Sequence, residues 1–555
     1  MTTDLLSSVD ISKLNDTSAT DTEACDEQVI RSIDKITGIA FKRPLMICLP
    51  FELLGIIFLE YAQQFSLWTT RVPPWVAVSY VCRHWRNAAL GCASLWARLF
   101  FVSPEWMDEL LVRSKAAPLF IHVDFARLSE SNSGPIRSFK KALGCMGRVQ
   151  ELWVDCSEYS MADMIQTGLT AAAPLLQSLR LSLPTSERGF VITKNTLPGA
   201  MPGLREVHLE PCHMYWASPI FDRLTMLSLN YVLNDTMECW DGLLLILSQS
   251  PCLRGLRLEN IPTDFDDSFM ITQNVAKVSL PHLEKLTLTD PIPWVAALLN
   301  QLEFPRSTLV QLGFDLYDSE EISLLIPFIT DKFGSRLSHP TASIGPPLRS
   351  LDFRHDGRGN WAFEFGTTNY ANIYRTSTAQ RGEDLDSRCS LRIEFTRTNF
   401  DVFLIGIAPL FDALPVEHLN IITMHSELEG NFDSLWTDTF WDAPELEVIE
   451  IGRGCANMLI HVLQPCFGVI FAPTLTDIAF RTIPFDHDTC EDEESHEYGI
   501  GCLMCLRSAL AGRAEAGVML QRLHLDRCTG IRREDIAELS KVVGRLEWTP
   551  PKETK

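Results

Sequence analysis

A six-residue pattern of the form L-x-x-L-x-L, or a close variant, returns along most of the chain and constrains its fold more than any other feature. Between Val149 and Leu309 the starts of successive copies are 27, 28, 20, 29, 30 and 26 residues apart. Such a fixed period is typical of a chain built from repeated structural units. The copies begin at Val149, Leu176, Leu204, Leu224, Leu253, Leu283, Leu309, Leu348, Val416, Leu446, Leu475 and Leu520, with a weaker one at Leu391.

The spacing of apolar residues within and before each copy predicts a strand and a helix. The last two leucines of L-x-x-L-x-L alternate with other residues, as expected of a strand with one buried face. Segments such as MECWDGLLLILSQ, before PCLRGLRL, have helical spacing. Each unit leaves apolar faces that only neighbouring units can cover, so the units stack. We expect parallel strands side by side in one curved sheet, with Leu256, Leu258, Leu286 and Leu288 among the most buried residues.

This pattern resembles the leucine-rich repeat. The last copy, LHLDRCTGIRREDIAELS, resembles the cysteine-containing repeat found in F-box proteins, with Cys528 at its turn. The resemblance implies an α/β fold: a leucine-rich-repeat solenoid over residues 149–548, with parallel strands inside and helices outside. Residues 355–390 and 485–499 break the period and are predicted to be loops. The alternative is a set of unrelated αβ units.

A second pattern precedes the repeats. LPFELLGIIFLEY begins at Leu49 and, after an insert, WVAVSYVCRHWRNAALGCASLWARL begins at Trp75. Apolar residues recur at helical spacing in both segments. Two or three short amphipathic helices bury little apolar surface on their own, so a face left over predicts a docking surface for a partner. The recurring residues are Leu54, Ile57, Phe58 and Tyr61 in the first segment and Val78, Val81, Cys82, Trp85 and Ala89 in the second.

The ordered set LPxE, IF, VCRxWR and LW resembles the F-box, which docks its protein onto the Skp-type adaptor of cullin–RING ubiquitin ligases. The insert YAQQFSLWTTRVPP is longer than a compact F-box needs, and Ala93 stands where the family often has Pro. The resemblance implies an F-box domain over residues 45–105, after an acidic, mostly disordered leader (1–40) and before a connecting segment (106–148). The implied adaptor-binding residues are Leu49, Pro50, Glu52, Leu54, Ile57, Phe58, Val81, Cys82, Trp85 and Trp96.

Charge and cysteine content limit the kinds of partner. The 555 residues carry a net charge of −23. Nucleic-acid binding relies on Lys and Arg neutralising phosphates, and adhesion to anionic membranes needs basic clusters, so both are disfavoured. The 16 cysteines are scattered and do not form a small disulfide framework. With no secretory signal and no apolar run long enough for a bilayer, we expect a cytoplasmic or nuclear protein.

Signatures of catalysis are missing, which favours a binding protein without a catalytic residue or cofactor. The sequence has no phosphate-binding G-x-x-x-x-G-K-[ST], no H-E-x-x-H and no G-x-S-x-G. A cluster of cysteine and histidine residues at short spacing could hold zinc. However, CLMCLRSAL is also typical of a helix packed in the core, and the acidic segment before it is typical of a solvated loop. We therefore predict no metal. The cluster consists of His487, Cys490, His496, Cys502 and Cys505. Seven Asp or Glu residues between Phe485 and Gly499 predict a mobile surface loop.

Side chains between the buried leucines are expected to face outward and to contact a target protein. Together with the F-box resemblance, these side chains predict that the protein is a substrate-recognition subunit of an SCF-type ubiquitin ligase. Such a subunit raises the effective concentration of target lysines near the ubiquitin-charged enzyme. The alternative is a leucine-rich-repeat scaffold or inhibitor with a non-functional F-box remnant; an unrecognised hydrolase is a weaker third. The expected target-binding residues are Trp153, Arg180, Glu206, His208, Arg257, Glu259, Asp352 and Arg354.

Overall fold

The computed structural model divides the chain into two compact units, Met1–Ile220 and Phe221–Lys555. Each unit has an α/β fold built around mostly parallel strands. The structure describes residues 49–65, 72–125, 133–156, 162–183, 191–199, 201–213, 215–233, 239–261, 277–315, 320–333, 347–356, 358–367, 389–396, 407, 409–426, 436, 439–452, 456–465, 469–486 and 501–551. The predicted leader, residues 1–40, lies outside these ranges.

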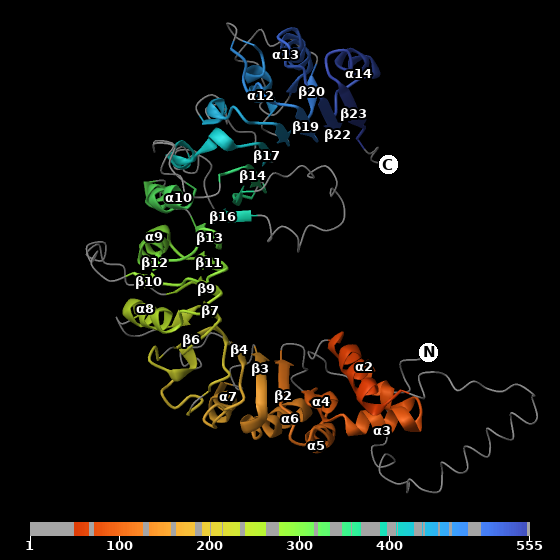
Figure 1. The fold of residues 1–555 in the computed structure, drawn as a ribbon, viewed down its shortest axis with the longest axis vertical. Coiled ribbons are helices and arrows are strands. Elements are labelled where there is room, and N and C mark those ends of the chain that lie inside the picture. The colour runs from red at the N-terminus through yellow and green to blue at the C-terminus, as the bar shows by residue number, and fades with distance from the viewer. Residues whose placement is uncertain are drawn as a thin grey trace, which may run out of the picture. The chain divides into compact units, whose positions relative to one another are not determined.

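The first unit begins with a group of short helices: α2 (Phe51–Gln63), η3 (Pro74–Tyr80), α3 (Arg83–Gly91) and α4 (Ala93–Trp96) (Figure 1). The second apolar segment is therefore not one continuous helix. A 3₁₀ turn ends at Tyr80, and α3 starts only after Cys82, whose extended backbone lets its Sγ accept a hydrogen bond from Trp85 N at 3.5 Å. The rings of Trp75 and Trp96 pack edge to face in the centre of this group, 5.6 Å apart.

A parallel ladder of strands follows in the same unit, with α5 (Pro104–Arg113), α6 (Ser133–Leu143) and α7 (Ala162–Gly168) on one side of it (Figure 1). Residues 106–148, predicted to be a connecting segment, contain a full strand of this ladder. This strand does not follow the repeat pattern, because PLFIHVD lacks the L-x-x-L-x-L spacing. The strands, in order, are β1 (Arg98–Leu99), β2 (Leu119–Asp124), β3 (Val149–Asp155), β4 (Ser178–Ser182) and β5 (Glu206–Glu210).

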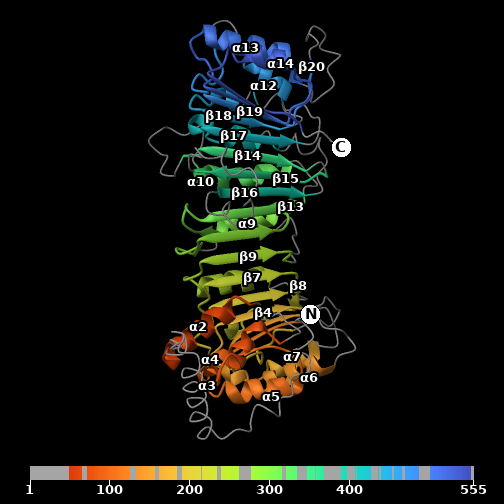
Figure 2. The ribbon, with the colours of Figure 1, turned by 90° about the vertical axis from the view of Figure 1, so that its right-hand side faces the viewer.

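The second unit repeats this arrangement. Figure 1 shows α8 (Cys239–Gln249), α9 (Ile292–Gln301) and α10 (Ile326–Phe333) together on one side of the strands, and Figure 2 looks onto strands lying side by side. The later helices are α12 (Ala456–Val462), α13 (Leu503–Glu515) and α14 (Arg533–Leu539). The parallel repeat strands are β7 (Met226–Asn230), β9 (Gly255–Glu259), β11 (Lys285–Thr289), β13 (Leu309–Asp315), β14 (Ser350–His355), β16 (Cys389–Thr396), β17 (Ile421–Ser426), β18 (Val448–Ile451), β19 (Asp477–Arg481), β22 (Arg522–Asp526) and β23 (Arg545–Thr549).

One part of the second unit departs from a simple repeat. The spatial order is β13, β16, β15 (Trp361–Gly366), β14 and β17, so a three-strand segment is inserted in reverse order. β15 is antiparallel to both neighbours, whereas β16 and β14 are parallel to β13 and β17. The prediction of a loop over residues 355–390 is therefore wrong for β15. Residues 368–388 lie outside the described ranges.

The core lies between the strands and their helices. Leu256, Leu258, Leu286 and Leu288 are at most 1% exposed, which confirms the predicted burial. Residues 487–500, most of the predicted acidic loop, lie outside the described ranges; on either side, β20 (Phe485–Asp486) pairs with β21 (Gly501–Cys502). Among the helices that the structure describes, none has the length and apolar character that crossing a membrane requires.

Candidate functional site

Helix α2 is apolar on two opposite faces. Leu54, Phe58 and Ala62 are at most 1% exposed and pack into the helical group. On the other side of the helix Leu53 and Ile56 are 47% and 57% exposed. The outer side is apolar between Leu53 and Ile57, with Glu60 beyond this stretch, and a helix with apolar side chains on both sides is normally covered on both. The outer side of α2 is therefore suited to burial against another molecule.

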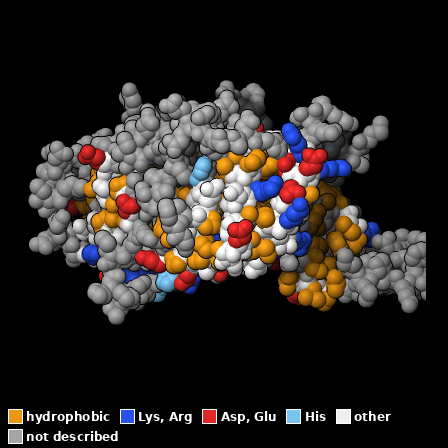
Figure 3. Space-filling model, turned by 90° about the horizontal axis from the view of Figure 1, so that it is seen from above, with side chains coloured by type: hydrophobic (Ala, Val, Ile, Leu, Met, Phe, Trp, Pro, Cys, Tyr) orange, Lys and Arg blue, Asp and Glu red, His pale blue; other side chains and the backbone are white. Residues whose placement is uncertain are grey.

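Residues next to α2 extend this apolar surface. Val81, in the break before α3, is 61% exposed, and the exposed ring of Phe51 lies 4.8 Å from that of His84. In Figure 3 hydrophobic side chains gather at the right of the view, the side on which Figure 1 draws α2 and α3. Clustered exposed apolar side chains mark interaction sites more often than chance would give. We call this surface the apolar face; it comprises Phe51, Leu53, Ile56, Ile57, Tyr61, Tyr80 and Val81.

The predicted adaptor-binding residues divide between this face and the layer beneath it. Of the apolar ones, Ile57 and Val81 are on the face. Pro50 and Glu52 are exposed at the start of α2, and the Leu49 carbonyl lies 2.8 Å from His84 Nε2. The remaining members support the face from below: Leu54, Phe58 and Trp96 are buried, Trp85 packs on Phe58, and Cys82 caps α3.

Five residues of the apolar face were not among the predicted adaptor-binding residues: Phe51, Leu53, Ile56, Tyr61 and Tyr80. The predicted helical stripe runs through Leu54, Ile57, Phe58 and Tyr61; Leu54 and Phe58 are buried, whereas Ile57 and Tyr61 are exposed. The run LLGIIFL could have indicated the exposed apolar side, because it contains no polar residue over two helical turns.

All eight predicted target-binding residues occupy strand positions that alternate with buried apolar residues. In the first unit, Trp153 on β3, Arg180 on β4 and His208 on β5 lie directly opposite one another in register. In the second unit, Arg257 Nε lies 2.8 Å from Glu259 Oε1 on β9, and Arg354 Nη2 lies 2.5 Å from Asp352 Oδ2 on β14. Glu206 lies beside Ser178 on the adjacent strand.

Trp153 is held in one orientation by two neighbours, His122 and Ser178. Its ring stacks on that of His122, with centroids 3.9 Å apart and planes 8° from parallel. Its Nε1 donates to Ser178 Oγ at 3.0 Å, and Ser178 donates in turn to Glu206 Oε2 at 3.2 Å. His122 Nε2 lies 2.9 Å from Glu151 Oε2. Sequence analysis did not find His122, because β2 lacks the repeat pattern.

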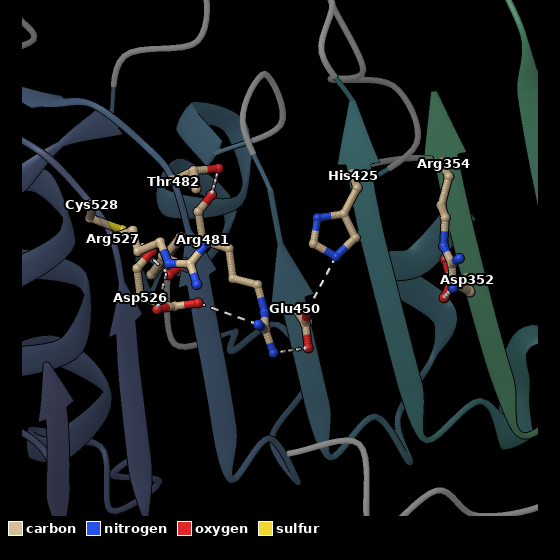
Figure 4. A network of polar contacts seen from close by, with 10 residues as sticks. Asp352, Arg354, His425, Glu450, Arg481, Thr482, Asp526, Arg527 and Cys528 are labelled. Carbon is tan, nitrogen blue, oxygen red and sulfur yellow. Dashed lines mark hydrogen bonds and ion pairs between the residues drawn. The ribbon is translucent and has the colours of Figure 1, made fainter. Parts of the chain in front are cut away.

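A second polar cluster lies on the strands of the second unit (Figure 4). Glu450 on β18 is only 5% exposed and sits between two basic groups from the neighbouring strands. Its Oε1 is 3.1 Å from His425 Nε2 on β17 and 2.5 Å from Arg481 Nε on β19. Arg481 also approaches Asp526 on β22, at 3.4 Å. Four consecutive strands are thus joined by side-chain contacts on their polar face.

The pKa of Glu450 responds to these contacts, and the pKa values of Arg354 and Glu364 on the nearby strands β14 and β15 are shifted as well. Burial opposes ionisation of Glu450, but the hydrogen bond with His425 and the charge of Arg481 outweigh it and lower the pKa of this carboxyl. The hydrogen bond with Asp352 raises the pKa of Arg354 further above its ordinary value. Burial, reinforced by the charge of Asp352, raises the pKa of Glu364 on β15. Since each charge has a close partner, the cluster organises the surface rather than presenting a free acid or base.

The residues weighed for a metal site are only partly described. Cys502 is buried and accepts a hydrogen bond from Cys505 N at 3.3 Å as the N-cap of α13, while His487, Cys490 and His496 lie outside the described ranges. Within the ranges that the structure covers, no three His, Cys, Asp or Glu side chains gather as metal ligands would. Burial raises the pKa of the Cys528 thiol to about 11, which makes it a poor nucleophile.

Both surfaces have properties that suit binding to another molecule. An exposed apolar helix face is suited to a protein partner, and a rigid polar sheet surface is suited to recognising charged side chains. Neither a comparison with models of protein families nor a search of the curated proteins finds a match to this chain.

Proposed function

We propose that this protein is the substrate-recognition subunit of a cullin–RING ubiquitin ligase. Its N-terminal helices act as an F-box that docks on the Skp-type adaptor, and its leucine-rich-repeat strands bind the target. The protein itself carries no catalytic residue in this proposal. It holds a target beside the ubiquitin-charged enzyme and so raises the effective concentration of the target's lysines.

The observation that carries the proposal is the apolar face around α2. The F-box-like motif LPxE…IF…VCRxWR…LW covers the helices that display this face. Seven large apolar side chains of this segment are between 38% and 61% exposed. Apolar anchors at the centre of an interface usually dominate its binding energy.

The second support comes from the strands. Parallel repeat strands with helices on one side present outward side chains on the other, and among the described residues many of these are polar and several are held by contacts with neighbouring strands. Repeat proteins commonly use such an extended surface for binding. The charged groups and the fixed Trp153 suit a protein target better than a phosphate polymer, given the net charge of −23.

Affinity purification tests the proposal. The wild-type protein should bring down a Skp-type adaptor and a cullin. Replacing Leu49 and Pro50 together by Ala should abolish this association, because both belong to the F-box-like motif at the start of α2, next to the apolar face. The circular dichroism spectrum should be unchanged, since neither side chain belongs to the core of the repeats. Recovery of equal amounts of adaptor with both proteins would refute the docking site.

A further inference from the structure

Nine outward side chains on β3, β4 and β5 form a small lattice in the first unit. The register places Glu151, Ser178 and Glu206 in one row and Asp155, Ser182 and Glu210 in another. The middle row is Trp153, Arg180 and His208. We call these nine residues the acidic platform: carboxylates at its four corners oppose one guanidinium, which gives a net charge of −3 with His208 neutral.

The platform combines exposed charged side chains with a tryptophan held in a fixed orientation. Asp155, Arg180, Glu206 and Glu210 are exposed, and the side chain of Glu151 is 29% exposed. The indole of Trp153 is fixed by its stack on His122 and by its bond to Ser178. Preorganised side chains lose little conformational entropy when a ligand binds.

We propose that the acidic platform binds an extended, basic segment of a protein, with arginine or lysine side chains at alternate positions. Carboxylates flank Trp153 on both sides along β3, two residues away in each direction. Alternate side chains of an extended peptide repeat every 6.6–6.8 Å or so, as they do along a strand. One basic side chain can therefore lie against the indole face opposite His122, as a cation–π pair, while its neighbours reach the carboxylates.

Arg180 limits the affinity in this arrangement. It lies between the four carboxylates and directly beside Trp153 in register, so it neutralises part of the charge that attracts the ligand. Removing its charge should therefore strengthen binding. A platform whose only role is structural would show the opposite or no effect. That the basic segment belongs to a ubiquitination target rests on the proposed function; the binding itself does not.

The probe is a fluorescently labelled peptide in which arginine alternates with serine, titrated into the full-length protein and followed by anisotropy. Its control replaces each arginine by citrulline, which keeps the shape and removes the charge. We expect saturable binding of the arginine peptide that weakens on going from about 0.05 M to about 0.5 M salt, and no binding of the citrulline peptide. Equal binding of both peptides, or none of either, would overturn the proposal.

Variants locate the binding on the platform. Trp153→Leu should weaken it by about fivefold or more, while Trp153→Phe retains most of the affinity. Asp155→Asn with Glu206→Gln should weaken it by about tenfold, because two attracting charges are lost. Arg180→Gln should tighten it, whereas Arg533→Gln, at an exposed site on α14, leaves it unchanged.

These outcomes are independent of adaptor docking. Arg180 and Asp155 are exposed, so we expect their substitutions to leave the fold intact and to change only the affinity for the peptide. Affinity unaltered by both Arg180→Gln and the double carboxylate variant would place the peptide elsewhere and refute the inference. A variant of the apolar face, such as Ile57→Glu, should bind the peptide as the wild type does, so failure of the proposed function and failure of this inference remain distinguishable.

Discussion

Buried polar side chains show what single residues contribute to joining neighbouring repeats. Asp290, just after β11, is 8% exposed, and its Oδ1 accepts a hydrogen bond from Ile261 N, after β9, at 2.9 Å. Burial raises the pKa of this carboxyl from its ordinary 3.8 to about 8. A second example from the same unit is Arg513, whose Nη1 and Nη2 donate hydrogen bonds to the carbonyls of Phe471 and Ala472. Desolvation lowers the pKa of Arg513 to about 10. Sequence analysis predicted neither, because burial of a polar residue depends on the tertiary structure.

The raised pKa of Asp290 predicts a pH dependence of stability. Between about pH 4 and pH 8 the folded state keeps a proton that the unfolded state releases, so the stabilising contribution is complete below this window and is lost as the pH rises through it. The free energy of unfolding should fall by up to about 1.4 kcal/mol per pH unit. Asp290→Asn keeps the acceptor for Ile261 N and should remove this part of the slope.

Urea unfolding at several pH values between about 5 and 8 measures this slope. Asp331→Asn is the matched control, because the Asp331 side chain is 81% exposed and should leave the slope unchanged. A slope in Asp290→Asn equal to that of the wild type would show that Asp290 is ionised when folded.

At the scale of elements, the repeat strands were predictable and the inserted strands were not. L-x-x-L-x-L fixes which side chains alternate into the core, and β9, β11 and β13 pair in parallel as that pattern requires. β15 carries WAFEFG, which alternates equally well but matches no repeat. Its pairing with β14 is a local hairpin in which His355 lies opposite Trp361, but the placement of β16 beside β13 and of β14 beside β17 depends on contacts between residues far apart in the sequence. Likewise, the stripe on α2 was predicted, but which side of it is buried depends on packing against Trp85.

If β15 is part of the hydrophobic core, truncating its buried side chain should lower the free energy of unfolding. Phe363 is 0% exposed, and its ring lies 5.0 Å from that of Phe353 and 5.8 Å from that of Phe411. Phe363→Ala should lower the free energy of unfolding by about 3–5 kcal/mol. Arg358→Ala, at an exposed site before β15, should change it by less than about 0.5 kcal/mol. Similar small effects from both substitutions in urea unfolding would mean that β15 is not part of the core.

At the scale of the molecule, the protein has two kinds of surface. The apolar face of α2 offers docking by burial of hydrophobic area, and the polar faces of the strands offer recognition by charge. Burial of apolar side chains is insensitive to salt, whereas contacts between exposed charges are screened. Adaptor binding should therefore persist at salt concentrations that release a basic target segment.

The most direct test of the central claim is complex formation between this protein and a purified Skp-type adaptor, followed by size-exclusion chromatography with light scattering. We predict a one-to-one complex with the wild type. Val81→Glu should abolish it, because the charge falls in the apolar face, while Val112→Glu should not, although Val112 on α5 is 74% exposed against 61% for Val81. Separate elution of folded wild-type protein and adaptor, or equal complex formation by Val81→Glu and the wild type, would contradict the account.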